Sequence, residues 1–350
     1  MKLLIVTQKM DKSDPVLGFM HGWVFHFAKT FERISVVCLE KGKVELPKNV
    51  SVFSLGKEKT ADSRRLGRGF TRMKYAWHFL RYITKFRNEY DAVFVHMNPE
   101  YMILGGMFWR FFRKSSALWY NHFSGGFMFR LAVFFSRKVF YTSPFSASAR
   151  FGKSARMPAG IDTDFFSPRG EPSSRSALFV GRIAPVKGIH TLVESACILD
   201  REGAQFSLTI VGDALSRDAG YDANVRKEGA ELVRRGKLVF KKGVPNTETP
   251  VIYSAHEVFV NLSPPGLFDK TVLEAFASGR VVVASSRAFA EILPEECLFE
   301  EGNAESLALT LRRVFDFSSD KKQKLASSFR EYVVKRHSLS YLAEELYKNL

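Results

Sequence analysis

The chain has 350 residues, of which 46% are hydrophobic and 25% are charged, enough for two domains of ordinary size. Its apolar runs are too short, or too often broken by arginine, for the roughly 20 residues of a membrane span. Its three cysteines lack the spacing of a metal site or of a disulfide framework. These features argue against a transmembrane protein, a zinc module and a disulfide-rich secreted domain.

Positive charge is concentrated in the first half of the chain. Residues 1–166 contain 27 Lys and Arg against 12 Asp and Glu, whereas residues 167–350 contain 25 against 24. This asymmetry predicts an anionic macromolecular partner. Residues 64–89 mix Arg and Lys with aromatic residues at helical spacing, which favours a membrane surface over nucleic acid. An ordinary solvated helix with its apolar side on the core explains the same pattern equally well.

The amino terminus, MKLLIVTQKM, is typical of a strand and has no small-residue cleavage site of a secretory signal. We therefore expect a cytoplasmic protein, with peripheral attachment to the cytoplasmic face of a membrane through its basic half.

Strands alternate with helices along both halves. The first half predicts strands at 2–7, 34–39, 50–55, 92–96, 117–120 and 138–142, and helices at 19–30, 64–89, 99–113 and 144–151, with a further Phe-rich helix after the turn at 125–126. The second half predicts strands at 177–180, 206–211, 238–241, 258–262, 281–284 and 297–299, with helices between them. The alternation predicts an α/β fold with two parallel sheets, each covered on both faces.

The segment 157–174 loses this periodicity and is rich in Pro, Gly, Asp and Ser, which indicates a linker. We therefore expect a basic Rossmann-like domain at 1–166 and a second one at 167–336. Residues 337–350 have amphipathic spacing and predict a helix that packs back on the first domain. The triplet Asp162-Thr163-Asp164 has the form of a metal-binding motif, but it follows no strand, which favours a turn.

The stretch 178–188, LFVGRIAPVKG, predicts a strand, a turn and the start of a helix. It places Arg182 and Lys187 beside a helix N-terminus, where backbone N–H groups already favour an anion. A phosphate-bearing ligand fits this arrangement, and two solvated loop charges are the alternative.

Ligands of open parallel sheets bind outside the carboxyl ends of the strands, so the residues that follow each strand are candidates. In the first half these are Gly18, His96 and His122, of which His96 is expected to be structural. In the second half they are Gly181, Arg182, Lys187, Gly212, Asp213, Gly243, Val244, the run 263–270 and Glu274. No G-x-G-x-x-G follows the first strand of either half, so we expect no dinucleotide cofactor.

Four segments, GRIAPVKG, IVGDA, PAGIDTDFF and the LEAFASG region that follows Phe268, together resemble the family-4 (group 1) glycosyltransferases of the GT-B fold. The resemblance implies two Rossmann-like domains around a central cleft, and a retaining transferase with a nucleotide diphosphate sugar as donor. It places Arg182 and Lys187 on the diphosphate, Gly18 near the phosphates, Thr271 and Val272 on the distal phosphate, Glu274 on the ribose, Gly243 and Val244 beside the base, and His122 near the donor sugar.

One position departs from the family pattern. Gly266 stands where the family usually has a sugar-binding Glu, and Asp269 replaces a Gly. Asp269 or Lys270 is therefore expected to contact the donor sugar instead.

The expected reaction uses fixed cations in place of a metal, with no cofactor, because Arg182 and Lys187 can stabilise the charge of the departing diphosphate. His122 is expected to help hold the sugar. The expected acceptor is a lipid-linked or cell-envelope glycan. Two alternatives stay open at this point: a nucleotide-sugar epimerase of the same fold, and a non-catalytic basic protein that binds a membrane or nucleic acid.

Overall fold

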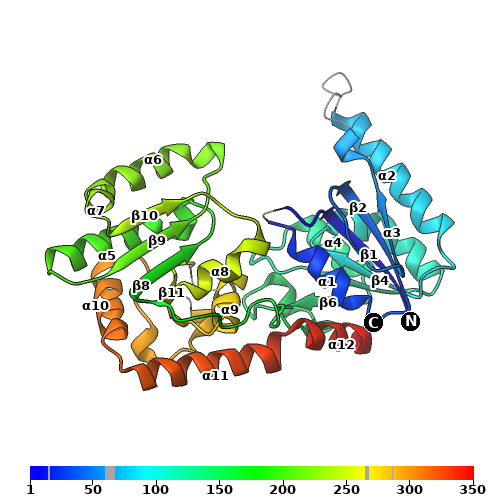
Figure 1. Cartoon of the computed structure of the whole chain (residues 1–350). Coiled ribbons are helices and arrows are strands. Elements are labelled where there is room, and N and C mark those ends of the chain that lie inside the picture. The colour runs from blue at the N-terminus through cyan, green and yellow to red at the C-terminus, as the bar shows by residue number, and fades with distance from the viewer. Residues whose placement is uncertain (15, 60–67, 265–267, 286) are drawn as a thin grey trace. The chain divides into compact units, whose positions relative to one another are not determined.

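The computed structural model describes residues 1–14, 16–59, 68–264, 268–285 and 287–350 (Figure 1). The chain divides into two compact units, Met1–Gly160 together with Leu339–Leu350, and Ile161–Ser338. The observed division after Gly160 lies within the linker segment, six residues before the division that the sequence suggested.

The first unit contains a seven-stranded parallel sheet with the order β3-β2-β1-β4-β5-β6-β7. Its strands are β1 (Lys2–Met10), β2 (Arg33–Lys41), β3 (Val50–Ser54), β4 (Ala92–His96), β5 (Ser115–Trp119), β6 (Lys138–Tyr141) and β7 (Ser154–Arg156). Its helices are α1 (Phe19–Phe27), α2 (Arg68–Lys85), α3 (Pro99–Phe111), α4 (Phe127–Phe135) and α12 (Leu339–Asn349).

The central strands β1 and β4 have buried apolar runs, Leu3 to Val6 and Ala92 to Val95, because both faces of the sheet are covered. Successive residues point to opposite faces, so Leu3 and Ile5 of β1 belong to one core while Leu4 and Val6 belong to the other. The first core is closed by α1 and α12, and the second by α2, α3 and α4. Buried residues of α2, such as Phe79, show that one side of this basic helix packs on the core.

The carboxyl-terminal helix α12 packs in the first unit, as the sequence predicted. Its apolar residues recur every three or four positions, which places Leu342 and Leu346 in the core beside α1. Trp23 of α1 donates a hydrogen bond of 2.8 Å to the carbonyl oxygen of Gly160, the last residue before the second unit. Gly160 has φ +68°, and a Cβ there would overlap Leu342. Close packing at this position therefore requires glycine.

The second unit contains a five-stranded parallel sheet with the order β10-β9-β8-β11-β12. Its strands are β8 (Ser173–Val180), β9 (Ser207–Val211), β10 (Leu238–Lys241), β11 (His256–Asn261) and β12 (Val281–Ala284). Its helices are α5 (Ile189–Arg201), α6 (Ala219–Glu228), α7 (Ala230–Arg234), α8 (Thr249–Ser254), α9 (Lys270–Ala277), α10 (Ala304–Phe315) and α11 (Ser319–His337).

Both sheets reverse their strand order once, between β1 and β4 in the first unit and between β8 and β11 in the second. At such a switch point the loops leave the carboxyl ends of two neighbouring strands in opposite directions, which opens a crevice for a ligand. The fold therefore provides one candidate crevice in each unit.

Three local predictions need correction. The segment 297–299 is not a strand, because a 3-10 helix covers Glu295–Cys297 and only an isolated bridge joins Leu298 to Ala284. The helix expected at 144–151 is reduced to a 3-10 turn at Ala147–Arg150. Strand β7 was missed because its three residues, Ser-Ala-Arg, carry no apolar alternation.

Candidate functional site

Glycines form the carboxyl edge of the second sheet. The N–H of Gly181, after β8, donates to Val211 O at 3.0 Å, and the N–H of Gly212, after β9, donates to Lys241 O at 3.0 Å. A Cβ at Gly212 would overlap the carbonyl oxygen of Gly181, so the two backbones can approach only without a side chain. Asp213 Oδ2 accepts a hydrogen bond of 3.1 Å from the N–H of Gly243, after β10. Three predicted glycines therefore meet along one edge, and Val244 follows the third.

Lys187 spans the switch point of this sheet. It lies in the turn after β8, and its Nζ donates to Ser263 Oγ at 2.9 Å in the loop after β11. The same Nζ forms an ion pair of 2.7 Å with Asp269 Oδ2, at the N-cap of α9. Ser263 Oγ and Asn261 Nδ2 also donate to Asp269 Oδ2. Residues from two separate stretches of sequence, the turn at Lys187 and the segment 261–269, thus converge where the fold favours a ligand.

Asp269 is ionised in this cluster. Burial raises the pKa of its carboxyl group, but the charge of Lys187 and hydrogen bonds from Lys187, Ser263 and Asn261 outweigh burial, so the pKa lies below its ordinary value. Asp269 therefore acts as the partner that orients Lys187. The sequence suggested that Asp269 or Lys270 contacts the donor sugar. In the structure, the Asp269 carboxylate contacts Lys187, Ser263 and Asn261.

Arg182 lies directly after Gly181 and is exposed. Its neighbour Ile183 donates its N–H to Asp213 O at 3.1 Å, which fixes the path of the turn. Arg182 forms no ion pair with any carboxylate in the described part of the chain. Its charge is therefore available to an anion at this edge.

Glu274 is buried in α9, with 8% of its surface exposed. Tyr253 Oη donates to Glu274 Oε2 at 2.9 Å, and Asn246 Nδ2 donates to Oε1 at 3.3 Å. Burial raises the pKa of Glu274 above its ordinary value, although Tyr253, Lys270 and Asn246 pull it down. Each carboxylate oxygen can accept two hydrogen bonds, so acceptor capacity remains for a ligand hydroxyl.

Lys270 begins α9, one helical turn before Glu274. Burial lowers the pKa of the Lys270 ammonium to about 7, against the attraction of the Glu274 carboxylate. Thr271 and Val272 complete the first turn of this helix. The N-terminus of α9 therefore lies next to the pair formed by Lys187 and Asp269.

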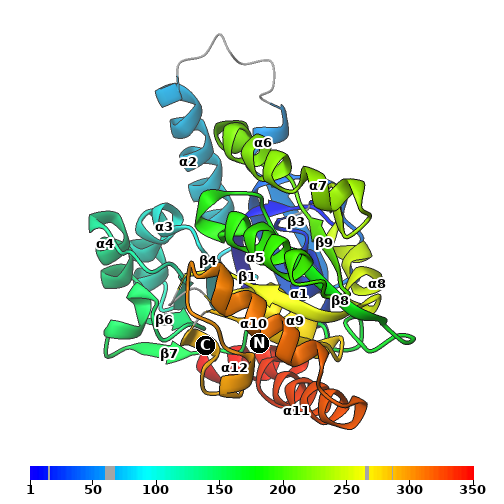
Figure 2. The same cartoon turned by 90° about the vertical axis from the view of Figure 1, so that its left-hand side faces the viewer.

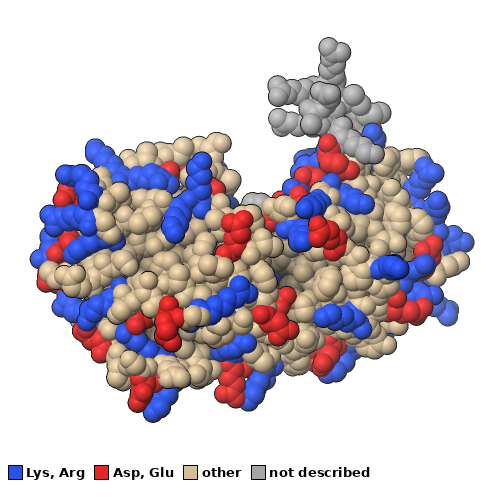
Figure 3. Space-filling view, in the orientation of Figure 1, with Lys and Arg blue, Asp and Glu red and all other residues tan. Residues whose placement is uncertain are grey.

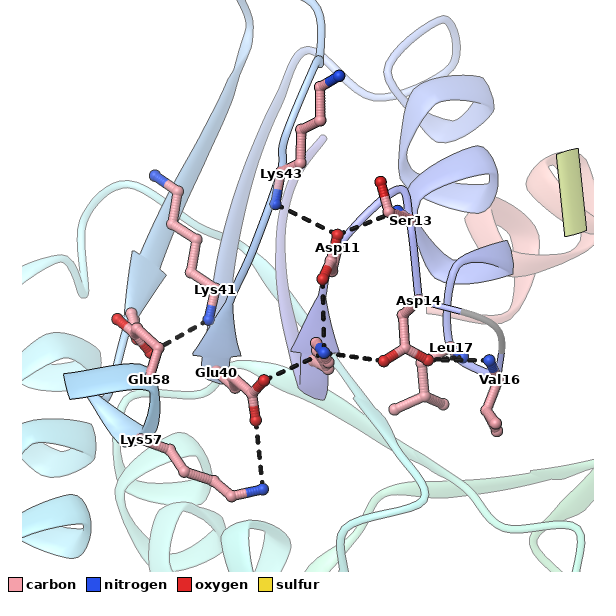
Figure 4. A network of polar contacts seen from close by, with 12 residues as sticks. Asp11, Ser13, Asp14, Val16, Leu17, Glu40, Lys41, Lys43, Lys57 and Glu58 are labelled. Carbon is pink, nitrogen blue, oxygen red and sulfur yellow. Dashed lines mark hydrogen bonds and ion pairs between the residues drawn. The ribbon is translucent and has the colours of Figure 1, made fainter. Parts of the chain in front are cut away.

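In the first unit, a salt-bridge network fixes the loop that leads to Gly18 (Figure 4). Lys9 Nζ lies 2.9 Å from Asp14 Oδ2 and 3.1 Å from Glu40 Oε1. Asp14 Oδ1 accepts hydrogen bonds from two backbone N–H groups just before Gly18, and Asp14 O accepts the N–H of Gly18 at 3.0 Å. A Cβ at Gly18 would lie 2.5 Å from that same oxygen. The loop therefore holds Gly18 at the start of α1.

His122 follows β5 at the carboxyl edge of the first sheet and is exposed. Its Nδ1 lies 2.9 Å from Ser124 Oγ, and its ring stacks on Phe123 with centroids 4.5 Å apart. The preceding Asn121 accepts the N–H groups of Thr142 and Ser143, which ties this loop to the end of β6. His122 is therefore held in place while its ring stays accessible.

His96, the last residue of β4, is buried against the rings of Phe19 and Trp23, which agrees with its expected structural role.

The structure brings together the predicted site residues of the second unit, and it places Gly18 and His122 at the carboxyl edge of the first. Gly266 lies outside the described residues. Sequence reasoning missed Asn246 and Tyr253, which hydrogen bond to Glu274. The available signal was indirect: a buried carboxylate requires hydrogen-bond donors.

Two properties of the described residues bear on the site. Within them, no group of three or more His, Cys, Asp or Glu side chains is arranged to hold a metal ion. None of the described helices is both long enough and apolar enough to cross a bilayer. The sequence Asp162-Thr163-Asp164 forms a turn in which Asp162 Oδ1 accepts the N–H of Phe165 at 3.0 Å.

Part of the second unit is similar to known proteins. Residues 174–316 match the family described as glycosyl transferases group 1. The 2-deoxystreptamine glucosyltransferase of Streptomyces kanamyceticus is 29% identical over 143 residues, which are 39% of this chain and 35% of that protein. The match thus spans about a third of the length of that curated relative.

Solved structures resemble the whole chain. Anabaena Alr3699/HepE in complex with UDP has a TM-score of 0.75 at 16% identity and covers 99% of both chains. The complex of HepE with UDP-glucose has a TM-score of 0.74 at 17% identity over the full length of both chains. Sucrose-phosphate synthase from Thermosynechococcus elongatus has a TM-score of 0.76 at 18% identity, with 99% of this chain and 98% of that chain covered.

These likenesses extend over both parallel sheets and their helices, and the match to the family covers most of the sheet that carries the glycine edge, Lys187 and Glu274. Residues 174–316 of the second unit thus resemble the group 1 glycosyltransferases, and the whole chain has the GT-B fold.

Proposed function

We propose that this chain is a glycosyltransferase that moves a hexosyl group from a nucleotide diphosphate sugar to an acceptor hydroxyl, with retention and without a metal ion. The observation that carries the proposal is the edge of the second sheet, where Lys187 pairs with the N-cap residue of α9 and Arg182 follows β8. The group 1 family match covers this same edge, and the solved relatives bound to UDP and UDP-glucose support a donor of this class.

Arg182 and Lys187 bind and neutralise the diphosphate in this proposal. The Lys187 ammonium has three N–H donors, of which Asp269 and Ser263 take two, so one is left for a phosphate oxygen. Asp269 fixes the direction of that third donor. Because the cations are already in place, they stabilise the growing negative charge without the reorganisation that water requires.

The bond between the sugar C1 and the diphosphate oxygen breaks, and a bond from C1 to the acceptor oxygen forms on the same face. The hydroxyl proton passes to the departing phosphate. Glu274 binds the ribose hydroxyls through its remaining acceptor capacity, and Gly243 and Val244 lie beside the base. Gly18 approaches the phosphates, and His122 holds the sugar.

The acceptor in this proposal is a lipid-linked or cell-envelope glycan. The support is the surplus of 15 positive charges in residues 1–166, which suits an acceptor presented at an anionic surface.

A donor screen tests the proposal. Purified protein is titrated by calorimetry with UDP and GDP sugars, and release of the nucleoside diphosphate is measured with and without a lipid extract. We expect binding of one donor and release that depends on the extract, with a product whose anomeric configuration by NMR matches the donor. No heat with any donor would favour a non-catalytic binding protein. An epimerised donor formed without extract would favour an epimerase.

A further inference from the structure

The first unit contains a long segment without acidic residues. Residues 101–161 include nine Lys and Arg and no Asp or Glu. On the face shown in Figure 3, by contrast, Asp and Glu are interspersed among Lys and Arg. Acidic residues of the loop after β1 and of β2, namely Asp11, Asp14 and Glu40, form the network around Lys9, away from this segment in the sequence (Figure 4). This segment, which holds α4 and all of α3 after its first turn with Glu100, therefore carries positive charge without an acidic residue of its own.

Large apolar side chains protrude from the same two helices. Figure 2 shows α3 and α4 side by side, and Gly106 of α3 approaches Phe135 of α4 so closely that a Cβ would lie 2.5 Å from the Phe135 side chain. The most exposed apolar side chains of the pair are Met107 at 67%, Phe111 at 81%, Phe127 at 77% and Phe134 at 64%. Clustered exposure of this size on adjacent helices marks an interaction surface.

A basic cavity lies at one end of this surface. It has a volume of about 430 Å³ and is lined by Arg110, Arg113, Lys114 and Arg137 together with Phe134 and Ser136, without a carboxylate among its lining residues. The cavity is at the amino ends of β5 and β6. His122 lies at their carboxyl ends, so the cavity is on the opposite edge of the sheet from the candidate reaction site.

Within the described ranges, no carboxylate forms an ion pair with the cations of this cavity. Arg110, Arg113 and Arg137 are exposed and form no ion pair with a carboxylate in the part of the chain that the structure describes. Lys114 donates instead to the carbonyl oxygen of Tyr90 at 2.6 Å. Burial and the charge of Arg110 lower the pKa of the nearby Lys153. The cavity is therefore suited to an anion with several oxygens.

We propose that the α3–α4 face docks on an anionic membrane surface, with Phe111 and Phe134 in the interfacial layer and a lipid phosphate in the cavity formed by Arg110, Arg113, Lys114 and Arg137. Phosphate recognition by arginine clusters and aromatic insertion at the lipid boundary are both favoured at such an interface. Nucleic acid fits less well, because exposed Met and Phe side chains gain little from contact with a phosphate backbone. This proposal does not depend on the proposed sugar donor, so the membrane surface and the transferase activity can each be refuted without the other.

Vesicle sedimentation tests the charge contribution. The full chain is mixed with vesicles of phosphatidylcholine alone, or with vesicles of phosphatidylcholine that contain 30% phosphatidylglycerol. The triple variant R110Q/R113Q/R137Q is compared with the control triple variant R201Q/R217Q/R313Q. Both triples remove three exposed arginines, so they change net charge equally. We expect the first triple to weaken binding to anionic vesicles about a hundredfold, at about fivefold per cation, and the second to change it less than threefold.

A second pair of variants tests the apolar contribution. Phe111→Ser is expected to weaken vesicle binding about tenfold, because burial of most of a Phe side chain is lost. The control Phe25→Ser removes an exposed ring from α1 and is expected to leave binding unchanged. Circular dichroism verifies the fold of each variant, and a salt titration of the wild-type protein gives a readout that needs no variant.

Absence of wild-type binding to anionic vesicles would overturn the proposal, as would equal losses from the two arginine triples. Tight binding to a duplex oligonucleotide that the first triple abolishes, without vesicle binding, would assign the surface to nucleic acid instead.

Discussion

The two units of this molecule share a strand order and differ in what surrounds it. Each sheet runs outward from a central first strand and reverses once, so each has a switch point at its carboxyl edge. In the second unit, hydrogen bonds and an ion pair join the polar side chains at that edge, among them Lys187, Asp269 and Glu274. In the first unit the corresponding edge carries the salt-bridge network of Lys9, Asp14 and Glu40, which holds the loop before Gly18, and the exposed ring of His122. Further positive charge lies on the outer helices of this unit.

The outer surfaces differ as much as the edges do. Among the described residues with large exposed apolar side chains, every aromatic one belongs to the first unit, while those of the second unit are aliphatic, such as Val251 and Leu309. The same topology therefore supports a polar ligand edge in one unit and an apolar, basic surface in the other. The side chains at the strand ends and on the outer helices, rather than the strand order, therefore determine what each unit can bind.

The largest effect is expected from Arg182→Ala, which tests whether the edge of the second unit takes part in the reaction. Removing one charge that stabilises a transition state costs about 3 to 4 kcal/mol, so we expect the rate of nucleoside diphosphate release to fall about a thousandfold. The melting temperature should not change, because Arg182 is exposed and unpaired with any described carboxylate. The exposed Arg201→Ala, at the end of α5, is the matched control. Activity retained by the Arg182 variant would remove the edge of the second unit from the mechanism.

The carboxyl-terminal helix distinguishes the first unit from the second, and Gly160→Ala tests its packing. A Cβ at Gly160 would overlap Leu342 and lie 2.7 Å from Trp23 Nε1, in a backbone with φ +68°. Overpacking and left-handed strain together should lower the free energy of unfolding by about 3 kcal/mol, measured by denaturant titration. Gly170→Ala has the same strain at φ +60° but no atom within 4 Å of the new Cβ. Equal losses from the two variants would refute the packing argument.

Much of this comparison could be predicted from the sequence, because buried parallel strands are apolar runs with clear ends. The bounds of β4, β10 and β12 were predicted to the residue. The run 297–299 has a similar composition, but only Leu298 pairs with the sheet, and composition alone does not reveal the lack of a partner strand. Short β7 has no pattern to detect.

The sequence predicted the site residues whose positions follow from the strand order. It missed the partners whose positions depend on side-chain packing. Glycines and cations that follow strands meet at one edge in any parallel sheet, so Gly181, Gly212 and Lys187 could be grouped in advance. The partners Tyr253 and Asn246 come from α8 and the turn before it, and they reach Glu274 only through the packing of α8 on α9. The pairing of Lys187 with Asp269 depends in the same way on the three-dimensional fold.

A buried lysine distinguishes the edge of the second unit, and its titration is measurable. The pKa of Lys270 is lowered to about 7 by burial, against about 10.4 in the unfolded chain. Between these values the unfolded chain binds the extra proton, so wild-type stability should rise with pH, by up to about 1.4 kcal/mol per unit. Relative to Lys270→Met, the wild type should gain about 2 kcal/mol between pH 7 and pH 9 in denaturant titrations.

The matched control for that measurement is Lys227→Met, which removes an exposed lysine of α6. It should show the same pH dependence as the wild type. A constant difference between the wild type and Lys270→Met across this range would show that the ammonium is not held in a buried environment.

A smaller effect is expected from the edge of the first unit. His122→Ala removes a ring that helps to hold the sugar in the proposed reaction, so kcat/KM should fall about tenfold, or about 1.4 kcal/mol, with no change in melting temperature. The exposed His190→Ala in the second unit is the control, since its ring bonds Tyr221 away from the edge residues. Equal activity of the two variants would show that the carboxyl edge of the first sheet takes no part in the reaction.

The smallest effect separates two helices of the first unit. The sequence pointed to the basic segment around α2 as the membrane surface, and Trp77 on α2 is 57% exposed. However, Phe79 and Ile83 of α2 are buried in the core, and the Trp77 ring lies 5.4 Å from the Arg81 guanidinium, so the indole already has a cationic partner. Trp77→Ser should therefore weaken binding to anionic vesicles less than threefold, against about tenfold for Phe111→Ser. The opposite ranking would move the membrane contact from α3 and α4 to α2.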